Sequence, residues 1–216
     1  MHSYSQCQED RFIVEYFKDQ TGNFLDIGAD DGVSCSNTLA LLEQGWTGTC
    51  MEPSPEAFKR MSKNYVERTL LDRAELLNAA LVPDYFRDGA LEFHDLQLPD
   101  GFIFTGYGTF SGTHALETLT KPKFQRGRLI TSSVSTIRCR DFFARYGDVW
   151  DFIDIDVEWL NYELLLSTPW RSLKRLKLLC IEQDCERSRY ENFMQHMDMR
   201  LIEIIDNNLF FAPIEP

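Results

Sequence analysis

The sequence has no long apolar run. None of its stretches approaches the roughly 18–20 residues of a membrane-spanning helix, so membrane insertion is not expected. The opening residues, MHSYSQCQEDR, lack the apolar segment of a secretory signal peptide. The six cysteines form no C-x-x-C pair and no zinc-finger spacing. Because Cys50 and Cys180 sit in apolar runs, where a free cysteine is a small buried hydrophobe, the sequence predicts a reduced, cytoplasmic protein.

Positive charge is also scarce. The chain contains 22 Lys and Arg against 34 Asp and Glu, a formal charge of −12. Proteins that bind phosphate backbones usually show the opposite balance, so binding of nucleic acid or of an anionic membrane is not expected. The one basic stretch, KPKFQRGR at 121–128, is interpreted as a solvated loop.

Repeats and linkers rich in Pro, Gly or Ser are absent. This predicts a single domain over residues 1–216, either a whole protein or one domain of a longer polypeptide. Apolar runs alternate with stretches of helical periodicity. Strands are predicted at 23–27, 47–51, 76–81, 149–155, 176–181, 200–205 and 209–212, and helices at 8–17, 36–44, 55–64, 162–166 and 189–196.

The alternation predicts an α/β fold: a mostly parallel sheet with helices on both faces and an antiparallel C-terminal edge. The middle of the chain has a different pattern. A hairpin is predicted at 86–93 around Asp88-Gly89, a loop rich in glycine and aromatic residues at 99–113, and an edge strand at 129–137. Ligands of such sheets bind beyond the carboxyl ends of the strands, near the topological switch point.

The segment FLDIGADDGVSCSNT at 24–38 is the most informative. An apolar strand ends in Asp26, Gly28 and Gly32 bracket a tight turn, and a helix is predicted to begin near Ser36. The acids of this turn would repel the phosphates of a dinucleotide, whereas S-adenosylmethionine carries an ammonium and a sulfonium and no phosphate. Glu52 ends the second strand, where a carboxylate can accept both hydroxyls of a ribose. The alternative is a turn that needs glycine for its geometry alone.

A resemblance to a known family covers nearly the whole chain. The segments SQCQEDRFIVEYF, FLDIGADDGVSCSNT, GWTGTCMEPSPEAF, DFIDIDVE and LLCIEQD, in this order and spacing, resemble the FkbM family of S-adenosylmethionine-dependent methyltransferases. The resemblance implies a Rossmann-like class I methyltransferase fold. It also implies methylation of oxygen, often on sugars or natural products.

The resemblance further implies which residues hold the cofactor. Glu52 would bind the ribose, and Ala79 and Ala80 would lie near the adenine. Gln6 and Asp10 would close over the cofactor; the alternative for these two is a helix cap. The methionine end would be held by Asp26, Gly28, Ala29, Gly32, Ser36 and Asn37.

Acidic residues mark the predicted position of the chemistry. Asp154 and Asp156 are two apart in a strand and should face the same side, and Glu182 and Asp184 end the next strand. Asp154, Asp156 and Glu182 are predicted to bind Mg²⁺ or Mn²⁺, with Asp156 indispensable to transfer. The alternative is that the two aspartates bind cofactor groups or cap a helix, with Glu182 paired to an arginine.

Two features bear on the acceptor. The family pattern D-V-E-G-A-E becomes Asp156-Val157-Glu158-Trp159-Leu160-Asn161 here, so Trp159 would either fill the acceptor site or offer a flat face to a sugar ring. The aromatic residues Tyr107, Phe110 and Tyr162 would add to that surface, or only pack the loops. His114, in the variable loop, is the candidate general base, with a structural role as its alternative.

Together these features predict an O-methyltransferase acting on a sugar hydroxyl of a glycan or glycoconjugate. One alternative is a binding module with a degenerate methyltransferase fold, suggested by Trp159 and Asn161. Another is a methyltransferase of a natural product or of nucleic acid, of which the charge disfavours the latter.

Overall fold

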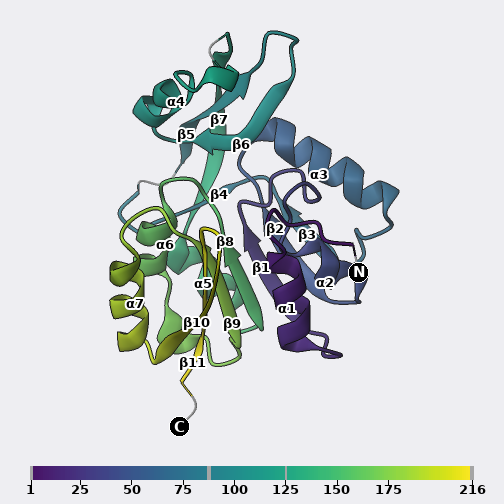
Figure 1. Cartoon of the computed structure of the whole chain (residues 1–216), viewed down its shortest axis with the longest axis vertical. Coiled ribbons are helices and arrows are strands. Elements are labelled where there is room, and N and C mark those ends of the chain that lie inside the picture. The colour runs from purple at the N-terminus through teal and green to yellow at the C-terminus, as the bar shows by residue number, and fades with distance from the viewer. Residues whose placement is uncertain (1, 87–88, 125, 215–216) are drawn as a thin grey trace.

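The computed structural model describes residues 2–86, 89–124 and 126–214, and for Tyr107 and Lys123 the backbone only. Its centre is a seven-stranded sheet (Figure 1). In spatial order the strands are β10 (Met199–Ile205), β11 (Asn208–Pro213), β9 (Leu178–Glu182), β8 (Phe152–Ile155), β1 (Asn23–Ile27), β2 (Thr47–Met51) and β3 (Ala74–Leu77).

Five neighbouring strands of this sheet, from β9 to β3, run parallel. Strand β11 is antiparallel to both β9 and β10, so the antiparallel strand lies one position in from the C-terminal edge. The predicted Rossmann-like α/β fold is therefore confirmed, with its reversed strand inside the edge rather than at it.

Helices cover both faces of the sheet. Successive residues of each strand point to opposite faces, and apolar side chains on both faces pack against helices. On β1, Phe24 packs with the cluster of α1 (Glu9–Phe17), α2 (Leu39–Glu43) and α3 (Pro55–Glu67). Its neighbours Leu25 and Ile27 pack with α5 (Cys139–Tyr146), α6 (Asn161–Ser167) and α7 (Arg187–His196). The central strands are thus buried on both faces, as their apolar runs predict.

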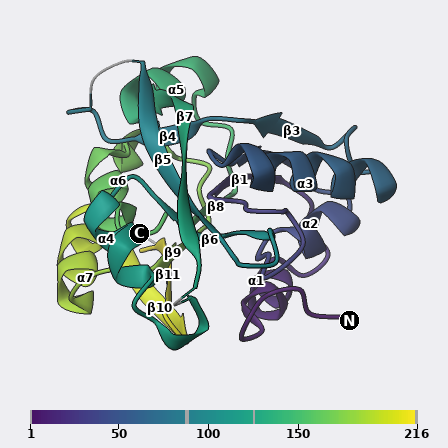
Figure 2. The same ribbon diagram turned by 90° about the horizontal axis from the view of Figure 1, so that it is seen from above.

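A second sheet of four strands lies above the carboxyl ends of the first, together with helix α4 (Gly112–Thr118) (Figures 1 and 2). We call this second sheet with α4 the cap. Its strands in spatial order are β4 (Ala80–Val82), β7 (Arg128–Arg138), β5 (Ala90–Gln97) and β6 (Ile103–Thr109).

The cap differs from the sequence predictions. The hairpin joins β5 to β6 rather than spanning 86–93, whose residues 87–88 lie outside the described part, and β6 occupies the predicted loop at 99–113. Strand β7 is interior, since it pairs with β4 on one side and β5 on the other. The predicted strand at 76–81 is in fact two strands, β3 and β4, which belong to different sheets.

The part of the chain that the structure describes has no disulfide bond. Among the described residues, no helix has the length and apolar character needed to cross a bilayer. All six cysteines are free thiols, and Cys50 and Cys180 are fully buried. Burial raises the pKa of both thiols well above the usual value, so they behave as small hydrophobes.

Candidate functional site

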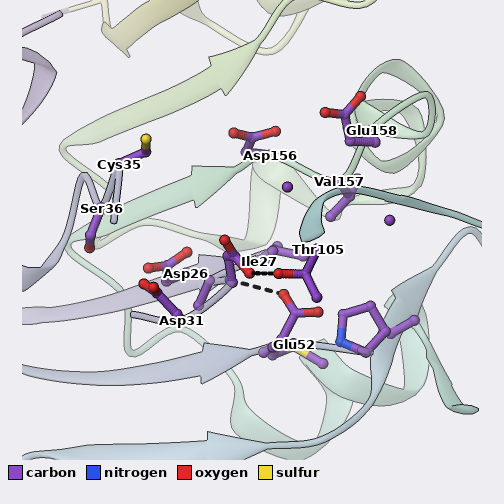
Figure 3. A pocket seen from close by; sticks show the side chains of 18 of the residues that line it. Asp26, Ile27, Asp31, Cys35, Ser36, Glu52, Thr105, Asp156, Val157 and Glu158 are labelled. Atoms are coloured by element: carbon purple, nitrogen blue, oxygen red, sulfur yellow. Dashed lines mark hydrogen bonds between the residues drawn. The ribbon is translucent and has the colours of Figure 1, made fainter. Parts of the chain in front are cut away.

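A cavity of about 830 Å³ lies between the carboxyl ends of the parallel strands and the cap (Figure 3). Its size is within the range of small-molecule sites. It opens at β1 and β8, which are neighbours in the sheet although the chain proceeds from β1 to β2 on the other side. The cavity is therefore at the topological switch point, where ligands of open α/β sheets bind.

Most of the sequence-predicted site residues line this cavity. Those that do are Gln6, Asp26, Gly28, Ala29, Ser36, Asn37, Glu52, Ala79, Ala80, Asp154, Asp156 and Glu182. Residues that were singled out from the sequence but do not line it include Asp10, Gly32, His114, Trp159 and Asp184.

The two glycines of the turn after β1 are required by packing. Gly28 has φ +96°, and a Cβ there would lie 1.8 Å from the backbone oxygen of Asp156. Gly32 has φ +71°, and its Cβ would lie 2.7 Å from the ring of Tyr65. Both glycines are explained by the geometry of the turn alone, so their presence is not evidence for a bound ligand.

The helix predicted at 36–44 is found but is shorter, because residues 36–38 are not helical. Helix α2 begins at Leu39, and the Ser36 hydroxyl accepts the backbone N–H of Leu39 at 3.1 Å. Thr38 donates its hydroxyl to the Asp26 carboxylate at 2.6 Å. Ser36 therefore holds the start of the helix, and the loop before it is left to line the cavity.

Asp26 and Asp154 form the floor of the cavity. They are paired across β1 and β8, and both are buried. Asn37 donates its side-chain amide to Asp154 at 3.1 Å. Burial raises the pKa of Asp26, and burial together with the neighbouring Asp26 charge raises the pKa of Asp154.

Glu52 is held at the end of β2. One carboxyl oxygen accepts the backbone N–H of Asp30 at 2.9 Å and the other accepts that of Ser54 at 2.7 Å (Figure 3). Burial raises the pKa of Glu52 to about 8. Each oxygen keeps a further lone pair for a ligand, because a carboxylate accepts about four hydrogen bonds.

Three more carboxyl groups gather on the cap side of the floor: Asp156, Glu158 and Glu182. The exposed surface of Asp156 faces the cavity (Figure 3), and the surrounding protein together with the Glu182 and Glu158 charges raises its pKa. Burial and the Glu182 charge raise the pKa of Glu158 to about 7. The cavity is therefore strongly acidic.

The predicted Mg²⁺ or Mn²⁺ site at Asp154, Asp156 and Glu182 is not supported. Within the described ranges, no group of three or more His, Cys, Asp or Glu side chains is arranged to hold a metal ion. The reason is that Asp154 is turned toward Asn37, and Glu182 accepts the side-chain amide of Asn161 at 3.4 Å.

Sequence reasoning missed the link between this floor and the cap. Thr105 on β6 donates to Asp30 (Figure 3). Arg60 on α3 donates to Thr105 and, at 3.1 Å, to the backbone oxygen of Ile103. On β5, Asp95 accepts the hydroxyl of Ser54 at 2.8 Å. The alternation of β6 was the available signal, but glycines at 106 and 108 obscured it.

The region after β8 also corrects the predictions. Trp159 does not fill the cavity: it is 52% exposed, and its ring lies 4.4 Å from that of His114. His114 does not line the cavity: it belongs to α4, and neither ring nitrogen has a hydrogen-bond partner among the described residues. Burial lowers the pKa of His114. Asn161 is buried and accepts the backbone N–H of Val157 at 2.9 Å, so it shapes the loop.

The N-terminal segment divides the roles predicted for Gln6 and Asp10. Asp10, in the first turn of α1, accepts the hydroxyl of Ser3 at 2.6 Å and the backbone N–H of Tyr4 at 2.7 Å, so it fixes the segment before the helix. Gln6 lines the cavity.

The predicted aromatic surface is only partly assembled. Of its members, Phe110 lines the cavity, Tyr162 packs on Tyr190, and the side chain of Tyr107 lies outside the described part.

Comparison with known proteins shows the fold. No family model matches the chain, and no curated protein matches it. Among solved structures it is similar to a protein of the NADB-Rossmann superfamily from Streptococcus agalactiae, with TM-score 0.51, 11% identity, and coverage of 98% of this chain and 70% of that one. It is also similar to the methyltransferase FkbM from Methylobacillus flagellatus, with TM-score 0.52, 12% identity, and coverage of 89% and 44%. A third neighbour is a human methyltransferase 10 domain containing protein, with TM-score 0.50, 11% identity, and coverage of 96% and 83%.

The TM-scores show a shared Rossmann-like architecture, and the low sequence identities show no more than that. The chain spans less than half of the FkbM methyltransferase, so what that protein binds or modifies does not transfer with the fold.

Proposed function

We propose that this chain is an S-adenosylmethionine-dependent methyltransferase. The observation that carries the proposal is the acidic cavity at the switch point, with Glu52 buried at the end of β2. Arg60 is the one cationic side chain among the described residues that line the cavity, and it is engaged with β6. Such a cavity repels the phosphates of a dinucleotide and suits a ligand with a sulfonium and an ammonium.

The lining fits the parts of that cofactor. Glu52 has free lone pairs for the two ribose hydroxyls. The apolar residues Met51, Ala79 and Ala80 stand beside it for the adenine. Asp26 and Asp154 supply two carboxyl groups for the cationic methionine end, whose positive charge favours their ionised forms. The roles of Asp26, Glu52, Ala79 and Ala80 are those that the FkbM resemblance implies, and Met51 and Asp154 are added from the lining of the cavity.

When bound, the cofactor supplies a methyl group activated by its sulfonium. The chain supplies alignment and the exclusion of water, because the cap covers the carboxyl ends of the strands. Asp156 accepts the proton of the acceptor hydroxyl. The surroundings that raise the pKa of Asp156 make its ionised form a stronger base than an exposed aspartate, and the positive charge of the cofactor favours that ionised form.

We propose a sugar hydroxyl of a glycan or glycoconjugate as the acceptor. Carboxyl groups at Asp156, Glu158 and Glu182 suit hydroxyl-rich ligands, and Phe93 and Phe110 add aromatic surface on the cap side. The alternative of a degenerate binding module loses its basis, because Trp159 leaves the cavity open and Asn161 is explained by its bond to Val157. The acidic surroundings also disfavour nucleic acid as acceptor.

Transfer of a labelled methyl group to a glycan panel tests this proposal. Wild-type protein should methylate at least one glycan. Asp156→Asn should abolish transfer while S-adenosylhomocysteine still binds, and Glu15→Gln on exposed α1 should leave transfer unchanged. If the protein binds the cofactor but methylates no glycan, the proposal of a glycan acceptor is wrong. If Asp156→Asn is fully active, the proposal that Asp156 is the general base is wrong.

A further inference from the structure

Trp159 is unlike the other tryptophans of the chain. It is 52% exposed, whereas Trp46, Trp150 and Trp170 are at most 5% exposed. The residues on either side of it, Glu158 and Leu160, line the cavity. The indole therefore stands at the mouth of the cavity and outside it.

The backbone holds the indole in that position. Glu158 and Trp159 both have a left-handed conformation, with φ +41° and +72°, which bulky residues rarely adopt. Two consecutive residues of this kind persist only where the surroundings enforce them. Here the Asn161 side chain fixes Val157 on one side, and the ring of His114 in the cap contacts the indole on the other.

Contact with His114 leaves much of the indole open to solvent. The imidazole is itself only 11% exposed and belongs to α4, so it packs against one side of the indole and restricts its movement. A large, rigid aromatic ring that loses little entropy on binding is an effective anchor for a ligand. The carboxyl groups of Glu158 and Asp156 nearby accept hydrogen bonds from hydroxyls.

This combination fits a saccharide. A pyranose ring has an apolar face of C–H groups, which packs on an aromatic ring, and hydroxyls at its edge, which bind carboxylates. We propose that Trp159 forms an outer subsite that stacks on a second sugar ring of the acceptor, next to the ring held in the cavity. The inference rests on the proposed function, and it requires an acceptor of at least two sugar units.

Binding to a glycan array, with no methyl transfer required, tests the subsite. Wild-type protein should retain glycans of two or more units. Trp159→Ala should lower their affinity about tenfold, and Trp159→Phe, which keeps an aromatic face, should lower it less. Val66→Ala, a change at another exposed apolar residue, should have no effect.

The emission of Trp159 gives a second readout, because the other three tryptophans are buried. Iodide should quench a component that glycan binding protects and that Trp159→Phe lacks. Unchanged glycan affinity in Trp159→Ala, or the absence of any retained glycan, would overturn the subsite. All these variants should bind S-adenosylhomocysteine with the same affinity as the wild type. If the wild type does not bind S-adenosylhomocysteine, the proposed function itself fails.

Discussion

Asp26 and Asp154 are paired in register at the carboxyl ends of two neighbouring parallel strands, so two buried carboxyl groups adjoin at the floor of the cavity. Their hydrogen-bond donors are neutral: Thr38 for Asp26, and Asn37 and the Cys180 thiol for Asp154. Such a pair is unfavourable when both groups are ionised, and a cationic ligand relieves the repulsion. The pair explains why the cavity suits a sulfonium.

The acidic cavity makes stability depend on pH. The pKa of Glu52 is raised to about 8 from 4.5, so the folded protein holds a proton that the unfolded chain releases. The stability from this group is fully present below about pH 4.5 and is lost as the pH rises through 8. Thermal melting should therefore show a lower Tm at pH 9 than at pH 6. The fall in Tm between pH 6 and pH 9 should be smaller in Glu52→Gln than in the wild type. Equal falls in the two proteins would contradict the raised pKa of Glu52.

Gly28 should be indispensable to folding. The Cβ of Gly28→Ala would meet the backbone oxygen of Asp156 at 1.8 Å, in addition to the strain of φ +96°. Gly147→Ala is the matched control, because Gly147 has φ +72° and no atom within 4 Å of its Cβ. Urea unfolding should show a loss of about 1 kcal/mol for the control and of about 3 kcal/mol or more for Gly28→Ala. Equal losses in the two variants would mean that the contact between Gly28 and the backbone of Asp156 leaves room for a Cβ atom.

His114 should destabilise the cap in acid. Burial and the Lys121 charge lower its pKa, and the nearby Glu117 charge only partly opposes them. The folded protein therefore favours the neutral ring, and its contribution, present above the ordinary pKa of about 6.5, is lost as the pH falls through the lowered value. Between pH 8 and pH 5, wild type should lose more stability than His114→Leu. A greater loss in the variant would show that the protonated ring is tolerated.

The fold was predictable because its strands obey the rule for buried parallel sheets. Strands β1 and β2 have the predicted bounds, and four of the five residues of each are buried. Strand β6 was missed because Gly106 and Gly108 replace the residues of one face, and Gly108 lies against the ring of Phe93. The division between β3 and β4 has no sequence signal, because it depends on which sheet each strand joins.

The acids of the site were predictable and their partners were not. Asp26, Glu52 and Asp154 lie within one residue of the carboxyl ends of β1, β2 and β8, and topology alone brings these strand ends together. Arg60 lies in the middle of α3, where its position reads as an exposed helix face. His114 was misplaced because α4 was not predicted, so the direction of its side chain was unknown.

Calorimetric titration with S-adenosylhomocysteine tests the central claim most directly. Wild type should bind it with one site per chain, and NAD should not bind. Glu52→Gln should bind about ten- to a hundredfold more weakly, because a charged or bidentate contact contributes roughly 1.5–3 kcal/mol, while Glu15→Gln should match the wild type. No binding to the wild type, or undiminished binding to a folded Glu52→Gln protein, would contradict the account.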